Sequence, residues 1–374
     1  MRIQPFAVEE WMNAYETGAR YNIAETCVDS VSMRELFELA GIDGEAWWRE
    51  FSARRLTYGD IEGAPAMLEG VCGLYKTIRP EHVVTCHGAA GANHHLFYSL
   101  VEPGDRVISV SPTYQQLTSI PEGYGADLRI LRLRKENGWL PDLEELRRLA
   151  VPGTKLICIN NPNNPTGALM STELLREIVK IAEDAGAWLL CDEVYRHLTQ
   201  EDAYSESVAD LYDRGISVSS MSKVFSLAGL RLGWIACRDA GLRRALLSHR
   251  DYNHISCGVF DEAAAAVALA HKDALLARNR GIVRENLRIL DDFIQSEPKL
   301  SYVRPRAGTT ALVSYEDALD SYEFARRMYE ETGAFVTPGD CFGEPKTLRL
   351  GYACDRETLK EGLAAMGRFL RSRG

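Results

Sequence analysis

The sequence predicts an α/β fold in which a mostly parallel sheet is covered by helices on both faces. Between about residues 80 and 240, short apolar runs alternate with helical patterns. The runs are apolar at successive positions, as is typical of parallel strands that are buried on both faces. The chain has 374 residues, of which 46% are hydrophobic, so it can bury the large core that such a sheet requires.

Five segments are predicted to be strands: 82–86 (HVVTC), 105–110 (DRVISV), 155–160 (KLICIN), 187–193 (AWLLCDE) and 216–220 (ISVSS). Between the third and the fourth, apolar residues recur at helical spacing, with Ser171 as the expected N-cap and Gly186 as the expected end of the helix. Strands that alternate with helices form a parallel, doubly wound sheet. In such sheets ligands bind beyond the carboxyl ends of the strands.

The charge, the apolar runs and the cysteines argue against a nucleic-acid-binding, membrane or secreted protein. Lys and Arg number 43 against 53 Asp and Glu, and no basic run could follow a nucleic-acid backbone. No apolar run is long enough to span a membrane, and the start of the chain does not look like a secretory signal. The nine cysteines form no CxxC pair, which favours buried thiols in a reducing compartment. We therefore expect a cytoplasmic protein without nucleic-acid or membrane partners.

Polar and small residues follow each predicted strand, in the segments 87–93 (HGAAGAN), 111–114 (SPTY), 161–167 (NPNNPTG), 192–195 (DEVY) and 220–223 (SMSK). Each segment alone could be an ordinary turn, a rigid loop or a helix cap. Because parallel strands end at one edge of the sheet, we expect all five around one crevice. His87, His94 and His95 lack the spacing of metal ligands, so no metal site is expected.

Five of these residues form an ordered set: Asn164, Asp192, Tyr195, Lys223 and Arg231. With the motifs NPNNPTG, DEVY and SMSKVFSLAGLR, the chain resembles the class I and II aminotransferases, which are fold-type I enzymes that use pyridoxal phosphate. The resemblance extends from LTYGDIEGAPAML (56–68) through VEPGDRVISVSPTY (101–114) to PGDCFGEPKTLRLGYA (338–353).

This resemblance implies a fold-type I transferase fold with two domains. A large cofactor-binding domain would span residues 45–280. Residues 1–44 and 281–374 would form a smaller α+β domain from the two chain ends. The apolar spacing predicts a long connecting helix over 273–296.

The family pattern also implies roles for the residues around the cofactor ring. Lys223 would form the Schiff base and then carry the proton to and from the substrate. Asp192 would pair with the pyridine nitrogen, so that the ring can accept electrons. Asn164 and Tyr195 would donate hydrogen bonds to the ring oxygen, and Tyr114 would stack on the ring face.

A second group of residues resembles the family's phosphate site: Ala89, Ala90, Ser220, Ser222 and Arg231. Relatives often carry polar side chains where this chain has Ala89 and Ala90, so we expect main-chain N–H groups at a helix start to hold the phosphate there. We also expect the nearby Arg231 and partial burial to disfavour the ammonium form of Lys223.

Arg349, in TLRLGYA, resembles the family arginine that binds the substrate α-carboxylate through two parallel hydrogen bonds, with Asn164 beside it. Tyr58, in TYGDIEG, resembles the tyrosine that reaches the phosphate in the neighbouring subunit, which implies a homodimer. Two candidates remain open for the substrate side chain. Glu25 lies in the N-terminal segment 21–30 (YNIAETCVDS), where relatives often contribute a glycine. It would favour a polar or cationic side chain unless it is a solvated or capping residue, whereas Arg306, in PRAGTT, would favour acidic substrates.

The leading functional prediction is transfer of an amino group from an amino acid to a 2-oxo acid. The first alternative keeps the cofactor but changes the outcome, as in β-eliminating carbon–sulfur lyases or capreomycidine-synthase-like cyclases, whose GGVTA-like region resembles AGTTALV (307–313). The second alternative is a cofactor-binding sensor domain joined to a winged-helix regulator. TYGD begins at residue 57, which is too early to accommodate a preceding DNA-binding segment.

Overall fold

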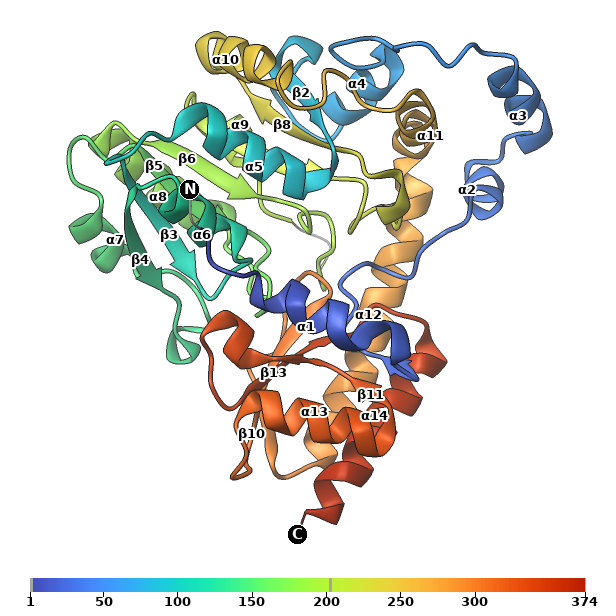
Figure 1. Ribbon diagram of the computed structural model, residues 1–374, viewed down its shortest axis with the longest axis vertical. Helices are drawn as coiled ribbons and strands as arrows, with labels where there is room; N and C mark the ends of the chain where they lie inside the picture. Colours follow the sequence, from blue (N-terminus) through green and yellow to red (C-terminus); the bar gives the residue numbers. More distant parts are fainter. Residues whose placement is uncertain (1–2, 202–203, 374) are drawn as a thin grey trace.

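The computed structural model describes residues 3–201 and 204–373, and its largest element is a seven-stranded sheet (Figure 1). The strand order is β2-β8-β7-β6-β5-β3-β4. All neighbouring strands pair in parallel except β8, which is antiparallel to both β2 and β7. The strands are β2 (Val83–Cys86), β3 (Arg106–Ser111), β4 (Asp127–Arg132), β5 (Leu156–Asn160), β6 (Trp188–Asp192), β7 (Gly215–Ser220) and β8 (Gly233–Cys237).

The predicted mostly parallel sheet is confirmed, and all five predicted strands are present. The sequence pattern missed β4 and β8. The edge strand β4 has exposed side chains such as Arg129 and Arg132, so it lacks the continuous apolar run that identifies a covered strand. β8 is fully buried, but it begins two residues after Arg231, the end of the motif SMSKVFSLAGLR, and the sequence analysis assigned no strand there.

Both faces of the central strands are buried. On β5, Ile157 packs into one apolar cluster together with α8 (Thr172–Ala185), and Cys158 packs into a second cluster together with α5 (Gly88–Leu100). This alternation explains why the strand is buried at every position and apolar up to Asn160, its last residue. As predicted, α8 begins at Ser171, whose hydroxyl accepts a hydrogen bond from Leu174 N at 3.2 Å, and ends at Gly186, which has φ 69°.

The two chain ends together form a smaller α+β unit, as predicted (Figure 1). Its four-stranded antiparallel sheet has the order β12-β13-β10-β9, and a short parallel pair joins β1 to β11. The strands are β1 (Tyr21–Asn22), β9 (Leu300–Tyr302), β10 (Thr310–Tyr315), β11 (Ala334–Phe335), β12 (Thr337–Pro338) and β13 (Thr347–Gly351). The helices of this unit are α1 (Ala7–Tyr15), α13 (Ser321–Thr332) and α14 (Arg356–Ser372).

The long helix α12 (Lys272–Ser296) runs between the two units and confirms the predicted helix over 273–296 (Figure 1). The exact domain boundaries at residues 45 and 280 stay a prediction. The remaining α-helices are α2 (Met33–Ala40), α3 (Gly44–Ser52), α4 (Pro65–Cys72), α6 (Gln116–Gly123), α7 (Leu143–Leu149), α9 (Val208–Leu211), α10 (Ala240–Arg250) and α11 (Val259–Ala270). Within the described ranges, no helix combines the length and apolar character needed to cross a membrane.

Candidate active site

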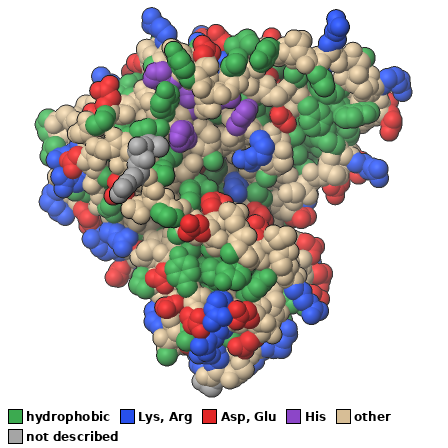
Figure 2. Space-filling view, viewed as in Figure 1, with side chains coloured by type: hydrophobic (Ala, Val, Ile, Leu, Met, Phe, Trp, Pro, Cys, Tyr) green, Lys and Arg blue, Asp and Glu red, His purple; other side chains and the backbone are tan. Residues whose placement is uncertain are grey.

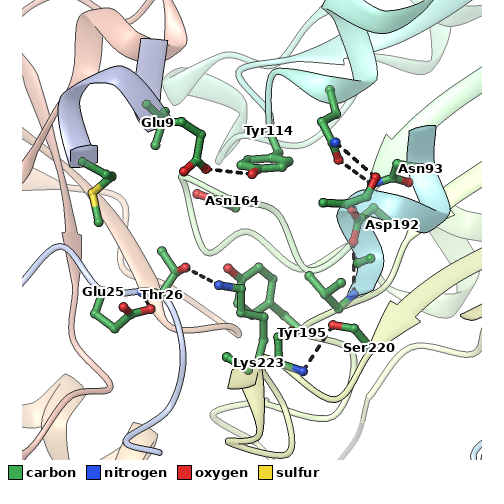
Figure 3. Close-up of a pocket in the computed structure, with 18 of the residues that line it drawn as sticks. Glu9, Glu25, Thr26, Asn93, Tyr114, Asn164, Asp192, Tyr195, Ser220 and Lys223 are labelled. Carbon is green, nitrogen blue, oxygen red and sulfur yellow. Dashed lines mark hydrogen bonds between the residues drawn. The ribbon is translucent and has the colours of Figure 1, made fainter. Parts of the chain in front are cut away.

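A cavity of about 280 Å³ lies at the carboxyl edge of the large sheet, where the predicted strand-end segments meet α1 and the N-terminal segment (Figure 3). Its volume is near the lower end of the range for small-molecule sites, about 300–1,000 Å³. The sequence-predicted residues that line it are Glu25, Ala89, Ala90, Tyr114, Asn164, Asp192, Tyr195, Ser220, Ser222, Lys223, Arg231 and Arg349. The expected convergence on one crevice is therefore confirmed.

Asn160, the last residue of β5, fixes the NPNNPTG loop to the neighbouring strand. Its Oδ1 accepts a hydrogen bond from Asn164 N at 2.7 Å, and its Nδ2 donates to the Asp192 carbonyl at 2.9 Å. One buried amide side chain thus sets the positions of two predicted site residues. The sequence analysis did not select Asn160, although it directly precedes the loop motif.

Asp192 ends β6 as a buried carboxylate (Figure 3). Its Oδ2 accepts a hydrogen bond from Asn93 Nδ2 at 2.9 Å, and its Oδ1 accepts one from Val194 N at 3.2 Å. Burial raises the pKa of Asp192, and these two donors and the charge of Lys223 only partly counter that effect. Asn93 lies on α5 and was missed as a site residue. It lies within the HGAAGAN segment, so the strand-end position was the available signal.

Lys223 is half-buried, and its amine contacts the N-terminal segment (Figure 3). Nζ donates a hydrogen bond to Thr26 Oγ1 at 2.7 Å and contacts Cys27 Sγ at 3.4 Å. Burial by itself lowers the pKa of Lys223, but Cys27, Tyr195 and Glu25 outweigh burial, so the pKa is raised.

The expectation that burial and Arg231 would favour a neutral lysine is therefore wrong for the protein without its cofactor. Arg231 directs Nη1 to the Ala228 carbonyl at 2.9 Å, while acidic groups from another part of the chain surround the lysine. The amine is thus an ammonium when no cofactor is attached. Thr26 and Cys27 belong to the quoted segment YNIAETCVDS, but their contact with a residue almost 200 positions away could not be read from it.

Glu25 lines the cavity and also fastens its own turn. Its Oε1 accepts hydrogen bonds from Thr26 N and Cys27 N, both at 2.8 Å. Burial raises the pKa of Glu25. The charge of Lys223 and the main-chain donors together lower it by more, so the pKa of Glu25 is below its ordinary value. Glu25 is accordingly an ionised carboxylate at the cavity wall. It both faces the cavity and caps its own turn, so the two interpretations of this residue hold together.

Arg349 projects from β13 and is 2% exposed. Nη2 donates to Ala24 O at 3.2 Å and to Thr337 Oγ1 at 3.0 Å, and Nη1 reaches Asn164 Oδ1 at 3.4 Å. Its Nε has no hydrogen-bond partner among the described residues, and no carboxylate in that part of the chain forms an ion pair with it. Burial lowers the pKa of this guanidinium. A buried cation with an unused donor fits a site for an anionic ligand group.

The opposite corner of the cavity suits a phosphate. The start of α5 meets Arg231 at Gly88, which has φ +69° and where a Cβ would lie 2.9 Å from Arg231 Nη2. Ala89, Ala90, Ser220 and Ser222 also line the cavity here, and Ser220 Oγ accepts a hydrogen bond from Ser222 N at 3.3 Å. Free N–H groups, hydroxyls and a guanidinium are the donors that a phosphate requires.

Tyr195 and Tyr114, the two tyrosines expected beside the cofactor ring, have different surroundings. Tyr195 is buried beside the lysine, whereas Tyr114 donates its hydroxyl hydrogen to Glu9 Oε1 at 2.9 Å (Figure 3). The ring of Tyr114 also packs against Phe6, with 4.9 Å between ring centroids. Glu9, on α1, is a cavity residue that the sequence analysis missed, since its helix carries no recognisable motif.

Two candidates lie outside the cavity. Tyr58 is 69% exposed, and its proposed reach into a neighbouring subunit stays a prediction. Arg306 is exposed and pairs with Glu201 at 3.4 Å, so its candidacy as a substrate-side-chain residue is wrong for this structure. The main-chain N–H of Arg306 donates to Gly167 O at 2.9 Å, and the side chain lines a separate pocket together with Glu201.

Comparison with known proteins gives a consistent result. The family model for aminotransferase class I and II matches residues 45–366. The chain belongs to this family. Its fold is similar to the crystal structure of a pyridoxal-phosphate-dependent aminotransferase from Streptococcus suis 89-1591, with a TM-score of 0.97. The two sequences are 44% identical, and the match covers 100% of this chain and 99% of the other.

Two curated relatives are similar over most of the chain. Capreomycidine synthase of Streptomyces vinaceus is 34% identical over 293 residues, which cover 78% of this chain and 75% of the relative. Aspartate/prephenate aminotransferase of Thermus thermophilus is 28% identical over 345 residues, which cover 87% and 86%. The protein is thus an enzyme of the pyridoxal-phosphate-dependent aminotransferase class with the fold-type I architecture. The residues of the cavity fit that cofactor, since they offer an amine, a buried carboxylate and a phosphate corner around one space.

Proposed function

We propose that the protein transfers an amino group from an amino acid to a 2-oxo acid, with Lys223 as the residue that holds pyridoxal phosphate as a Schiff base. One observation carries this proposal: a half-buried amine, a buried carboxylate and a buried arginine with an unused donor line the same cavity. When bound, the cofactor supplies an electron sink for the substrate α-carbon.

The residues of the large domain would hold and orient the cofactor. The carboxylate of Asp192, already fixed by Asn93, would keep a proton on the pyridine nitrogen. Tyr195 and Asn164 would donate hydrogen bonds to the ring oxygen, and Tyr114 would cover one ring face. The phosphate would bind at the corner described above, made of Ala89, Ala90, Ser220, Ser222 and Arg231.

The substrate would be held by Arg349, whose planar guanidinium can donate two parallel hydrogen bonds to an α-carboxylate. Asn164, at 3.4 Å from Arg349 Nη1, would help to orient that group. Once released, the amine of Lys223 would take the proton from the substrate α-carbon and return it. The Thr26 hydroxyl, which accepts from Nζ at 2.7 Å, would keep the amine oriented.

Borohydride reduction followed by peptide mapping tests the covalent assignment. Reduction of the cofactor-loaded enzyme should place the label on Lys223, and the Lys223→Ala variant should bind cofactor without being labelled. A label on another lysine would overturn the assignment.

We also propose a homodimer in which Tyr58 reaches the neighbouring site. Apolar side chains gather over α2 and α3 on the surface, at the upper right of Figure 2. Trp48 is 51% and Leu56 is 81% exposed, close in sequence to Tyr58. Mixing Lys223→Ala with Tyr58→Phe subunits should give hybrids with one native site, whose activity exceeds that of either parent. Sedimentation as a monomer would contradict the proposal.

A second outcome is favoured by the 34% identity to capreomycidine synthase, which matches the cyclase alternative. The products separate the outcomes. An oxo acid with pyridoxamine phosphate indicates transamination, and ammonia with unchanged cofactor indicates elimination. Loss of water without ammonia indicates replacement or cyclisation.

A further inference from the structure

We propose that the substrate of this site is an amino acid with a cationic side chain, recognised by carboxylates that the N-terminal residues bring to the cavity wall. This inference rests on the proposed function, because it assigns the α-carboxylate to Arg349. It adds the substrate class and two residues, Glu9 and Glu16, that no sequence motif selected.

The acidic wall comes from α1 and the segment that follows it. Residues 8, 9, 12, 13 and 16 line the cavity, and their spacing of three to four positions places them on one helical face. Two of them are glutamates, and Glu25 adds a third carboxylate from the next segment. Figure 3 shows Glu9 and Glu25 on the side of the cavity that lies across from Asp192 and Asn93.

Each of these carboxylates is held by a neutral partner. Glu9 Oε1 accepts from the Tyr114 hydroxyl at 2.9 Å, and Glu16 Oε1 accepts from Asn22 Nδ2 at 3.1 Å. Glu25 accepts from two main-chain N–H groups. None of the three forms an ion pair with a lysine or arginine of the described ranges. The wall is thus oriented by neutral donors and makes no direct ion pair within the described ranges, although the charge of Lys223 reaches Glu25.

The cations of the cavity have other partners once the reactants are bound. Arg231 faces the phosphate corner, and Arg349 has an unused Nε in a side chain that is 2% exposed, which points to an anionic ligand group. Lys223 lowers the pKa of Glu25, but an amine that accepts the substrate proton must first be neutral, and in that form it supplies no charge to Glu25. A cationic substrate side chain is the group that would balance the remaining carboxylates.

A guanidinium and an ammonium can both pair with these carboxylates, so an amino acid of each kind is tested. Arginine is compared with citrulline, which has nearly the same shape without the charge, and lysine is compared with norleucine. Cofactor-loaded enzyme is mixed with each amino acid, and kcat/KM is measured by the loss of cofactor absorbance. Glutamate serves as the acidic comparison.

We expect at least a tenfold preference for a cationic amino acid over its neutral counterpart, the size of one hydrogen bond to a charged group. Glu25→Gln and Glu9→Gln should each reduce that preference, the ratio of kcat/KM for the cationic amino acid to kcat/KM for its neutral counterpart, about tenfold. The amide oxygen of glutamine can still accept the Thr26, Cys27 and Tyr114 hydrogen bonds, so the fold is preserved.

Glu10→Gln is the matched control, since Glu10 lies on the same helix but faces a separate groove beside α13. A preference for neutral or acidic amino acids, or an unchanged preference in Glu9→Gln and Glu25→Gln, would overturn the proposal while leaving transamination intact. If no amino acid reacts, the proposed function fails instead. Calorimetric titration with arginine and citrulline would then still measure the charge preference, and equal affinities would overturn it.

Discussion

Replacing Asn93 with leucine should destabilise the ionised form of Asp192, the carboxylate proposed to pair with the cofactor ring. Asn93 Nδ2 donates to Asp192 Oδ2 at 2.9 Å, and both side chains are almost fully buried. Leucine has a similar shape but no donor. Burial already raises the pKa of Asp192, and Asn93 is the first of the groups that lower it, so its loss raises this pKa further.

The expected size follows from the kind of hydrogen bond. A hydrogen bond to a charged group contributes about 1.5–3 kcal/mol, which corresponds to about ten- to a hundredfold in a rate or equilibrium constant. The carboxylate form of Asp192 should exist only at higher pH in the variant. We therefore expect kcat to fall about ten- to a hundredfold and the acidic limb of the pH–rate profile to move to higher pH.

The assay is the pH dependence of the amino-acid half-reaction, followed together with the absorbance spectrum of the bound cofactor. Asn286→Leu is the control, because it removes a buried asparagine whose Nδ2 donates to a carbonyl, Cys354 O, outside the cavity. That variant should lose stability without a change in the pH profile. An Asn93→Leu enzyme that retains cofactor and shows the wild-type acidic limb would refute the reasoning.

Three further changes test other parts of the structure. Arg349→Lys should raise KM about ten- to a hundredfold with a smaller effect on kcat, because an ammonium cannot donate two parallel hydrogen bonds; a larger loss in kcat than in affinity would contradict this. Thr26→Val should slow the half-reaction about tenfold in stopped-flow experiments, whereas Thr26→Ser, which keeps the acceptor for Lys223 Nζ, should not. Burial raises the pKa of Glu262 from 4.5 to about 7, so folding stability should fall as the pH rises between these values, by about 3 kcal/mol at about 1.4 kcal/mol per pH unit. Urea unfolding at pH 5 and pH 8 should show this loss, and Glu262→Gln should remove it; equal pH dependence in both proteins would contradict the assignment.

Much of the cavity could be predicted because parallel strands end at one edge. Asp192 is the last residue of β6 and Lys223 lies in the loop that follows β7, so the order of strands in the sheet brings them together. The same rule located the NPNNPTG loop after β5. For these residues, recognising the strands was almost sufficient to predict the site.

Other features depend on contacts that sequence spacing does not encode. The outward direction of Arg306 follows from main-chain hydrogen bonds between its loop and Gly167. The edge strand β4 pairs on one side only, so its exposed arginines concealed it. In both cases the deciding partner is remote in the chain, and local patterns of apolar and polar residues gave no sign of it.

The raised pKa of Lys223 has the same origin, and it shows what the N-terminal segment contributes. Residues 23–27 are held in place from the small unit, because Gly351 N donates to Ile23 O at 2.8 Å and a Cβ at Gly351 would lie 1.8 Å from Glu25 O. The same segment accepts a hydrogen bond from Arg349 at Ala24 O and from Lys223 at Thr26 Oγ1. It therefore connects the proposed carboxylate site to the reactive amine. Because Arg349 and the anchoring Gly351 both belong to β13, a shift of the small unit relative to the large sheet would change the Lys223 contact while the Arg349 contact is kept. A family pattern places the lysine and the arginine, but the electrostatic environment they share is set by the segment between them.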